Sequence, residues 1–121
     1  MRIRYKAHIT VDGDTLRFKW RGLWWYARIV GLDADEMKGR HKKRAEQQKD
    51  KLDSLMCRWP RPKMRAKVGK VQGNKGLFIK HHNGRFLVYL KIWSWRQLGY
   101  VDYSDYMKQK KMVKRNSRWN T

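Results

Sequence analysis

The stretch VDGDTLRFKWRGLWWYARIVGLDADE, residues 11–36, decides how this chain folds. Residues 12–14, Asp-Gly-Asp, have the composition of a turn, and residues 15–20 alternate polar and apolar side chains as a half-buried strand does. Arg-Gly at 21–22 favours a tight second turn, and residues 23–32 then predict a long, aromatic-rich strand. The stretch therefore predicts an antiparallel hairpin with the apolar members of 15–20 facing inward.

The segment before this hairpin also alternates. Residues 2–11 put basic side chains on one face and apolar side chains on the other, as a half-buried strand does. The side chains expected to be buried are Ile3, Tyr5, Ala7, Ile9 and Val11. Together with the hairpin, this strand completes a meander of three antiparallel strands.

One amphipathic helix is predicted between residues 41 and 57. Apolar residues recur there at helical spacing, and the expected buried positions are Ala45, Leu52, Leu55 and Met56. Pro60 and Pro62 end it, because proline and the residue before it disfavour continued helix. Further strands are expected at residues 64–68, 77–80 and 86–93.

The C-terminal part is predicted to be less regular. Residues 94–103 are aromatic and have no strand or helix period, and a short helix is expected from Ser104, its N-cap, to Lys111. This order of elements predicts a mainly β protein with flanking helices, an α+β class. We interpret residues 1–113 as one domain, a small OB-fold barrel, and residues 114–121 as a basic C-terminal tail. An SH3-like barrel is an alternative to the OB fold, because SH3-like barrels also begin with a meander.

The charge of the chain points to a polyanionic partner. It has 31 Lys and Arg against 10 Asp and Glu, a net charge of +21, and nucleic acid is the leading candidate. No run of residues approaches the roughly 18 apolar residues of a spanning helix, so no membrane partner is expected. The one cysteine, Cys57, excludes an internal disulfide and a zinc site with several thiolates, and is expected to be buried. The alternating N-terminus does not resemble a secretory signal, so we expect an intracellular, cytoplasmic protein, compatible with a phage or plasmid origin.

Five of the ten acidic residues lie within residues 11–36, against the general charge of the chain. Asp14 enters the hairpin and Asp33 follows it, so the two can converge at one end of the barrel. Carboxylates suit a hard cation, Ca²⁺, Mg²⁺ or Mn²⁺, and two of them leave positions for water and a substrate phosphate. Glu36, three residues beyond Asp33, is placed where a base can polarise water, whereas Asp12 is interpreted as a turn residue.

Three segments carry a more specific signal: VDGDT at 11–15, YARIVGLDADE at 26–36 and, more weakly, GRFLVYL at 84–90. In the first two, an Arg follows the second Asp of DGDT by fourteen residues, an Asp comes five residues later, and a Glu three after that. In these motifs and their order the chain resembles the staphylococcal nuclease (thermonuclease) family. The resemblance covers about residues 3–89 in outline and implies a nuclease-like OB-fold.

The resemblance also implies residue roles. The implied Ca²⁺ ligands are Asp14, Asp33 and the backbone carbonyl of Ala34. Glu36 would act on the attacking water, and Arg28 and Arg85 would bind the phosphate and stabilise the charge of the transition state. Products would carry a 3′-phosphate. Mg²⁺ or Mn²⁺ are the alternative cofactors.

The chain departs from the family at residues 33–36, Asp-Ala-Asp-Glu, where the family has Asp-Thr-Pro-Glu. Asp35 adds a carboxylate in place of a rigid proline, which can change the metal preference or the loop position. Two arginines also have structural interpretations: Arg28 can pack on aromatic rings, and Arg85 follows an ordinary Asn-Gly hairpin.

Basic and aromatic residues outside this stretch are candidates for nucleic-acid binding. The run from residue 38 to 51 can track phosphates, and base stacking on aromatic rings is worth roughly 1 to 3 kcal/mol per base. The candidate nucleic-acid-binding residues are Lys38, Arg40, Lys42, Lys43, Trp95 and Arg96.

The sequence as a whole predicts a divalent-metal-dependent nuclease that hydrolyses phosphodiester bonds in DNA or RNA with little sequence preference. A non-catalytic, basic OB-fold nucleic-acid-binding protein is the alternative, and a ribosome-associated or packaging protein is a third. Basicity supports all three, whereas the ordered acidic residues support only the first.

Overall fold

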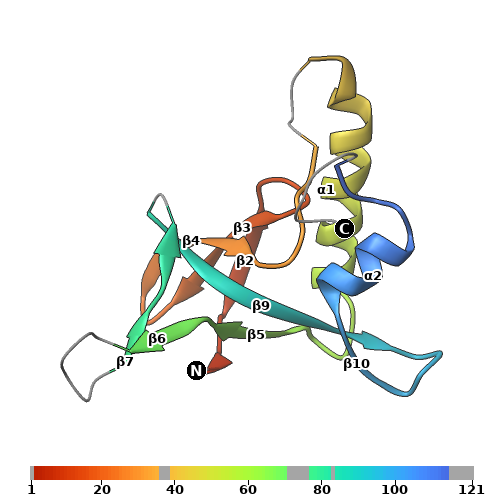
Figure 1. The fold of residues 1–121 in the computed structure, drawn as a ribbon. Coiled ribbons are helices and arrows are strands. Elements are labelled where there is room, and N and C mark those ends of the chain that lie inside the picture. The colour runs from red at the N-terminus through yellow and green to blue at the C-terminus, as the bar shows by residue number, and fades with distance from the viewer. Residues whose placement is uncertain (1, 36–38, 71–76, 83, 115–121) are drawn as a thin grey trace.

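A computed structural model describes residues 2–35, 39–70, 77–82 and 84–114. The fold is mainly β with two α-helices and one 3-10 helix, an α+β class, as predicted (Figure 1). In chain order the elements are β1 (Arg2–Ile3), β2 (Ala7–Thr10), β3 (Thr15–Trp20), β4 (Leu23–Ile29), η1 (Gly39–His41), α1 (Lys42–Met56), β5 (Lys63–Ala66), β6 (Val68–Lys70), β7 (Leu77–Ile79), β8 (His81–His82), β9 (Arg85–Ser94), β10 (Gly99–Asp102) and α2 (Tyr103–Gln109).

Eight of these strands form one mixed sheet. Its main path is β1-β5-β9-β4-β3-β2, β8 and β10 pair with β9, and β6 and β7 form a separate ladder. All pairs are antiparallel except β4 with β9, which are parallel. Among the described strands, β1 and β2 stand at the two ends of the path and do not pair with each other, so the sheet is not closed and the predicted OB barrel is not confirmed.

The predicted hairpin is present as β3 and β4. The two strands pair in register from Thr15 with Arg28 to Trp20 with Leu23. The turn residues Arg21 and Gly22 have φ of 53° and 78°. Positive φ at both central residues gives the turn a twist that matches the flanking strands, which explains the glycine there. The predicted meander is therefore confirmed, with β2 on the other side of β3.

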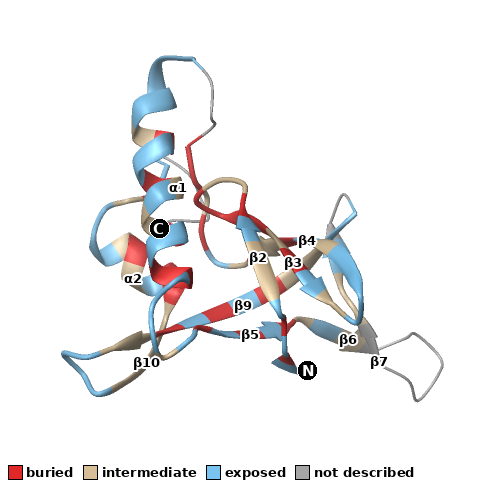
Figure 2. Ribbon diagram, turned by 180° about the vertical axis from the view of Figure 1, so that it is seen from behind, coloured by how far each residue is buried: buried red, intermediate tan, exposed pale blue. Residues whose placement is uncertain are grey.

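The core lies between the sheet and the two helices. The inward positions of the hairpin are fully buried at Leu16, Phe18 and Ala27, and Trp20 packs against the core from its edge. The predicted helix is confirmed as α1, and its four predicted apolar positions are all buried. Figure 2 shows the same pattern, with buried residues along β9 and on the sides of the helices that face the sheet.

The prediction for the N-terminal strand is wrong in its second half. Ile3 and Tyr5 are buried, but Ile9 is 48% exposed and Thr10 is buried in its place. The segment consists of two strands: β1 pairs with β5, whereas β2 pairs with β3. The chain changes partner between Ile3 and Ala7, and the alternation of inward and outward side chains changes phase with it.

Three further expectations are corrected. The aromatic segment contains a regular strand, β10, paired with the end of β9. Helix α2 begins at Tyr103, and its N-cap is Asp102, whose carboxylate accepts from the Asp105 N–H at 3.0 Å. Ser104 is therefore not the cap. Cys57, expected to be buried, is exposed directly after the last residue of α1.

Candidate active site

The Asp-Gly-Asp turn between β2 and β3 is fixed by local and distant contacts. The Asp14 N–H donates to the side chain of Asp12 at 3.0 Å, which agrees with the interpretation of Asp12 as a turn residue. A Cβ on Gly13 would lie 2.9 Å from the Cβ atoms of both Ala34 and Gln48, so only glycine fits between the loop and α1.

Tyr103 of α2 ties this turn to the C-terminal helix. Its hydroxyl donates to the Gly13 carbonyl at 2.7 Å, and the residue is completely buried. Burial raises the pKa of Tyr103, so the hydroxyl keeps its proton and remains a donor. The turn therefore presents the next residue, Asp14, in one fixed position.

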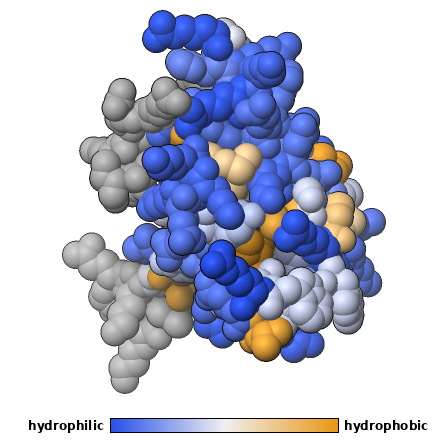
Figure 3. Space-filling view, turned by 90° about the vertical axis from the view of Figure 1, so that its right-hand side faces the viewer, coloured by the Kyte–Doolittle hydropathy of each residue, from blue (hydrophilic) through white to orange (hydrophobic). Residues whose placement is uncertain are grey.

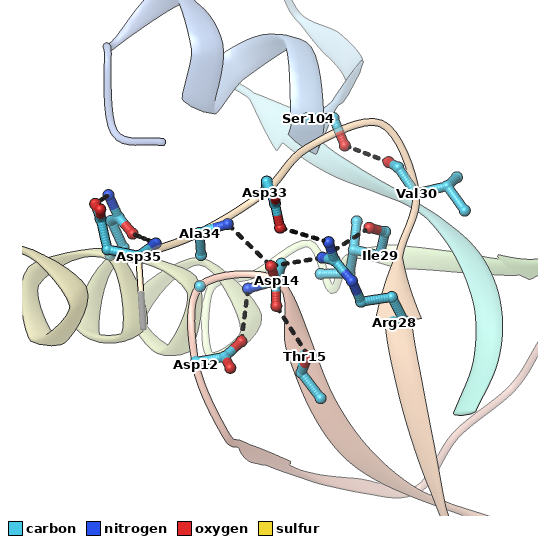
Figure 4. A network of polar contacts seen from close by, with 12 residues as sticks. Asp12, Asp14, Thr15, Arg28, Ile29, Val30, Asp33, Ala34, Asp35 and Ser104 are labelled. Carbon is cyan, nitrogen blue, oxygen red and sulfur yellow. Dashed lines mark hydrogen bonds and ion pairs between the residues drawn. The ribbon is translucent and has the colours of Figure 1, made fainter. Parts of the chain in front are cut away.

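The side chain of Asp14 accepts two hydrogen bonds and forms one ion pair. Oδ2 lies 2.6 Å from Arg28 Nη1 and accepts from the Ala34 N–H at 2.9 Å, and Oδ1 accepts from the Thr15 hydroxyl at 2.9 Å. The Asp14 carbonyl also accepts from the Ile29 N–H at 2.8 Å, which anchors it to the end of β4. These bonds aim the carboxylate at the loop after β4 (Figure 4).

Arg28 joins the two predicted metal ligands. Its Nη2 donates to Asp33 Oδ1 at 2.9 Å, while its Nη1 pairs with Asp14. The guanidinium therefore lies between carboxylates that are nineteen positions apart in the sequence (Figure 4). We name Asp12, Asp14, Asp33 and Asp35 the acid cluster.

Opposing effects act on the protonation of Asp14. Burial and the neighbouring Asp12 carboxylate raise the pKa of Asp14, while Arg28 and the Ala34 N–H lower it, and the net result is a pKa of about 6. The Arg28 pair alone would predict a low pKa. Since the carboxylate is only 7% exposed, we give the loss of hydration the greater weight.

The loop after β4 is held by α2 and by the chain beyond it. The Ser104 hydroxyl donates to the Val30 carbonyl at 2.6 Å, and the Lys114 N–H donates to the Asp33 carbonyl at 2.8 Å. Gly31 has φ of 93° and lies against Ser104, so a side chain there would be strained and crowded. These contacts explain how Asp33 returns to the entrance of β3.

Asp35 bonds to α1. Its backbone N–H donates to Gln48 Oε1 at 2.8 Å, and its carboxylate accepts from Gln48 Nε2 at 2.6 Å. Arg44 Nε lies 3.0 Å from the same carboxylate, an ion pair whose angles do not make it a hydrogen bond. Asp35 is therefore a structural anchor between the loop and α1.

The structure brings only some of the predicted site residues together. Asp14, Asp33 and Arg28 converge, and Ala34 turns its N–H toward Asp14. Arg85 is exposed at the start of β9, two residues before Leu87, the register partner of Arg28. Its backbone pairs with that of His82 in β8. Glu36 and Lys38 lie outside the described residues.

Two cavities adjoin the acid cluster. Arg28 lines one of about 440 Å³ together with Lys67, Leu87 and Tyr89. The other, of about 370 Å³, is basic, and the residues that line it are Arg40, His41, Lys43, Arg44, Gln47, Gln48, Lys111 and Met112. Gln48 and Arg44 connect this second cavity to Asp35. Lys42, the first residue of α1, is exposed beside it.

Trp95 and Arg96 lie far from Arg28, beyond the opposite end of β9. They follow β9, whose length places its two ends roughly 30 Å apart. Both are exposed and line a groove of about 840 Å³ between the β9–β10 hairpin and α2. Trp93 forms its aromatic floor, with edge contacts to Trp95 and Tyr100 at 5.5 and 5.3 Å.

Sequence reasoning missed Gln48 and Tyr103, the residues that position the acid cluster from the two helices. A signal for Gln48 exists: it lies at helical spacing between Ala45 and Leu52, on the buried face of α1. A buried polar side chain needs partners, so a glutamine at such a position predicts hydrogen bonds across the interface. Nothing local distinguishes Tyr103 from other aromatic residues.

No family model and no curated protein matches this chain. In the part of the chain that the structure describes, no helix combines the length and the apolar composition required to cross a bilayer. Figure 3 shows a mostly hydrophilic face on the side of α2 and β10, with hydrophobic residues in small separate areas.

Proposed function

We propose that this protein is a divalent-metal-dependent nuclease that hydrolyses phosphodiester bonds in DNA or RNA with little sequence preference. The observation that carries the proposal is the meeting of Asp14 and Asp33 on one guanidinium, that of Arg28. The two acids come from either side of a hairpin, and the resemblance to the staphylococcal nuclease family implies that these three residues share a site.

We also propose that the fold is of the OB type. Its support is the path of the sheet, which runs from β1 to β2, two consecutive segments of one N-terminal stretch. A bend between them, near residue 5, would bring the ends of the path together. The parallel pair β4 and β9, with α1 inserted between β4 and β5, adds to this support.

The oxygens available at the acid cluster fit a hard cation. Asp14 and Asp33 offer carboxylate oxygens, and the loop adds backbone carbonyls, the ligand chemistry that Ca²⁺, Mg²⁺ and Mn²⁺ prefer. Asp14 and Asp33 would hold the ion, Ca²⁺ by resemblance, and Ala34 would add its carbonyl. A bound ion of this kind supplies electrophilic activation of a phosphate oxygen and neutralises charge.

Side chains of the protein would bind the phosphate and take up the proton of the attacking water. Arg28, which now neutralises two carboxylates, lines the cavity of about 440 Å³ and can reach a phosphate there. Its two donors suit the charge that builds on a phosphate in the transition state. Arg85 projects from β9 on the same outward side as Leu87, in reach of the same cavity by register. Glu36 would take a proton from the attacking water.

The charge of the protein supports a polyanionic substrate. A net charge of +21 attracts phosphates over a distance and makes binding weaken steeply as salt rises. Arg40, Lys42 and Lys43 surround the start of α1 next to the acid cluster. A duplex or a single strand with its scissile phosphate at Arg28 would lie beside this basic surface.

A second candidate function is non-catalytic binding of nucleic acid. One observation favours it: Arg28 is fully engaged by two carboxylates, and Asp35 by α1, so the acid cluster already has a structural use. In that case the basic surface alone would carry the function.

The test is a cleavage assay with single-stranded and double-stranded DNA and RNA, each with Ca²⁺, Mg²⁺, Mn²⁺ or EDTA. A nuclease cleaves with at least one ion and stops with EDTA. Glu36→Gln should lower the cleavage rate by about 10²–10⁴-fold with oligonucleotide binding retained. Binding without cleavage under every ion would support the second candidate, and unchanged cleavage by the Gln variant would remove Glu36 from the mechanism.

A further inference from the structure

A second group of potential metal ligands lies where β2 meets the C-terminal end of α1. His8 projects from β2, Asp53 lies in the last turn of α1, and Cys57 follows its last residue. Nε2 of His8, a carboxylate oxygen of Asp53 and Sγ of Cys57 all lie within 4.8 Å of one another. We name these three residues the His8–Asp53–Cys57 cluster.

The arrangement results from helical spacing and strand packing. Asp53 and Cys57 are four residues apart, so they share one side of the helix end. His8 reaches them from the strand, with Nε2 at 3.3 Å from Asp53 Oδ1. This is the chain's one cysteine, and it lies beside one of only four histidines. The three ligand types therefore meet without any local sequence motif.

The distance between His8 and Asp53 fits a tetrahedral ion, and Cys57 Sγ lies within 4.8 Å of both ligand atoms. Zinc bonds to nitrogen and oxygen are roughly 2.0–2.2 Å and those to sulfur about 2.3 Å, which in a tetrahedron separates the ligand atoms by roughly 3.3–3.6 Å. The His8 to Asp53 distance of 3.3 Å already matches. Because Cys57 is exposed at the helix end, rotation of its side chain can bring Sγ into the same range.

We propose that the His8–Asp53–Cys57 cluster binds a borderline-soft divalent ion of the Zn²⁺ class, with water as the fourth ligand. Imidazole and thiolate select such ions, whereas Ca²⁺ and Mg²⁺ prefer oxygen alone. On binding, the thiol of Cys57 gives its proton to solvent and its sulfur bonds to the ion. The partner is thus a different class of metal from that of the acid cluster.

Thr10 fixes the orientation of the Asp53 carboxylate. Its hydroxyl, on a residue only 7% exposed, donates to Asp53 Oδ1 at 2.8 Å. A ligand held by such a bond keeps its orientation, and loss of the bond typically weakens metal binding by about 10–100-fold. Thr10 therefore acts as a positioning residue for the carboxylate.

The new site is separate from the acid cluster. Along α1, Asp53 is five residues beyond Gln48, the residue that holds Asp35, a distance of about 7.5 Å. The ion would link β2 to the end of α1, two elements that are otherwise joined here by the Thr10 and His8 bonds. Binding to the folded state alone then stabilises it.

The experiment is a titration of the reduced protein with Co²⁺, a spectroscopic substitute for Zn²⁺. We expect a thiolate-to-cobalt charge-transfer band that saturates at one equivalent and disappears on addition of Zn²⁺ but not of Ca²⁺. Cys57→Ser should lose the band, and His8→Ala and Asp53→Asn should weaken binding by more than tenfold. Thr10→Val should weaken it by about 10–100-fold.

Two variants serve as matched controls. Asp50→Asn removes an exposed carboxylate one turn earlier on α1 and should bind Co²⁺ like the parent. Asp14→Asn alters the acid cluster and should also leave the band unchanged. Absence of the band in the parent protein would overturn the proposal, because no thiolate would then bind the ion. Binding of Co²⁺ by His8→Ala and Asp53→Asn as tight as that of the parent would also overturn it, because the band would then come from an isolated thiol. Circular dichroism confirms that each variant is folded.

Discussion

The two halves of α1 both make polar contacts with neighbouring segments, but the contacts of the first half are buried and those of the second half are exposed to water. In the first half, Gln48 and Arg44 engage Asp35, a carboxylate that is 5% exposed. At the far end, Asp53 meets His8 across a surface where the side chain of Asp53 is 55% exposed. The Arg44–Asp35 and His8–Asp53 ion pairs, of 3.0 and 3.3 Å, therefore differ in how far water reaches the carboxylate.

That difference in hydration decides what each contact contributes. A buried polar group that loses its partner cannot recover the bond from water, and the cost is about 1–3 kcal/mol or more for a charged group. An exposed pair exchanges one partner for water and contributes about 0–1 kcal/mol. The first half of α1 is thus suited to fixing the acid cluster, and at the far end the contact between His8 and Asp53 can be replaced by bonds to a ligand.

The largest effect is expected on the cleavage rate, which should depend on the acid cluster and not on the His8–Asp53–Cys57 cluster. Asp14→Asn should lower metal-dependent cleavage by about 10³-fold, because several kcal/mol of charge stabilisation depend on the ion that Asp14 would hold. Asp53→Asn should cleave at the parent rate. Initial rates on a labelled oligonucleotide at saturating Ca²⁺ measure both. Equal losses in the two variants would mean that the sites are not independent.

Gln48→Leu should test the buried contact by stability. The change removes two hydrogen bonds to Asp35, one of them to a buried carboxylate, and we expect the free energy of unfolding to fall by about 3–4 kcal/mol. Urea denaturation measures it. The control is Gln47→Leu, at the exposed neighbouring position, with an expected change within about 0.5 kcal/mol. A loss as small as the control's would show that Gln48 does not anchor the loop.

The raised pKa of Asp14 predicts how stability depends on pH. Since the folded pKa, about 6, exceeds the unfolded value of 3.8, the folded protein holds this proton more tightly. The resulting stability is present below the unfolded pKa and is lost as pH rises through about 6, to an extent of up to about 3 kcal/mol.

Asp14→Asn cannot titrate at this position. The free energy of unfolding of the parent, taken relative to this variant without metal, should therefore decrease between about pH 4 and pH 7. Denaturation curves of the two proteins at matched pH values provide the measurement. An increase over that range would show that Arg28 outweighs burial at Asp14.

The smallest effect is expected at the exposed end of α1. Without metal, Asp53→Asn should change the free energy of unfolding by no more than about 1 kcal/mol, because the Asp53 side chain is 55% exposed and the amide oxygen of the variant can still accept from the Thr10 hydroxyl. With saturating Zn²⁺ the parent should become more stable while the variant does not. Thermal denaturation with and without Zn²⁺ measures this. An equal shift in both proteins would place the bound ion elsewhere.

Much of the fold follows from local sequence. The hairpin of β3 and β4 could be predicted from alternation and from Arg21-Gly22, and α1 from apolar spacing. The phase of β2 could not, because the side of a strand that faces the core depends on which partner it pairs with. The strand β10 depends in the same way on its pairing with β9.

In the candidate site, too, some contacts could be predicted from the sequence, whereas others depend on how the elements pack. The hairpin predicted that Asp14 and Asp33 converge, the resemblance implied that Arg28 joins them, and the three residues meet. Spacing could not predict that Asp35 would be taken by Gln48, since that contact requires α1 to lie against the loop. Nor could it predict Cys57 beside His8, 49 positions away in the sequence.

The sequence by itself determined the β3–β4 hairpin, helix α1 and the basic charge, since each depends on the composition or on neighbours a few residues apart. Tertiary structure decided which acids are anchored, which side chains water reaches and which distant residues share a site. The physical reason is that burial and partner choice arise only when elements pack, and the same carboxylate contributes differently in water and in the core.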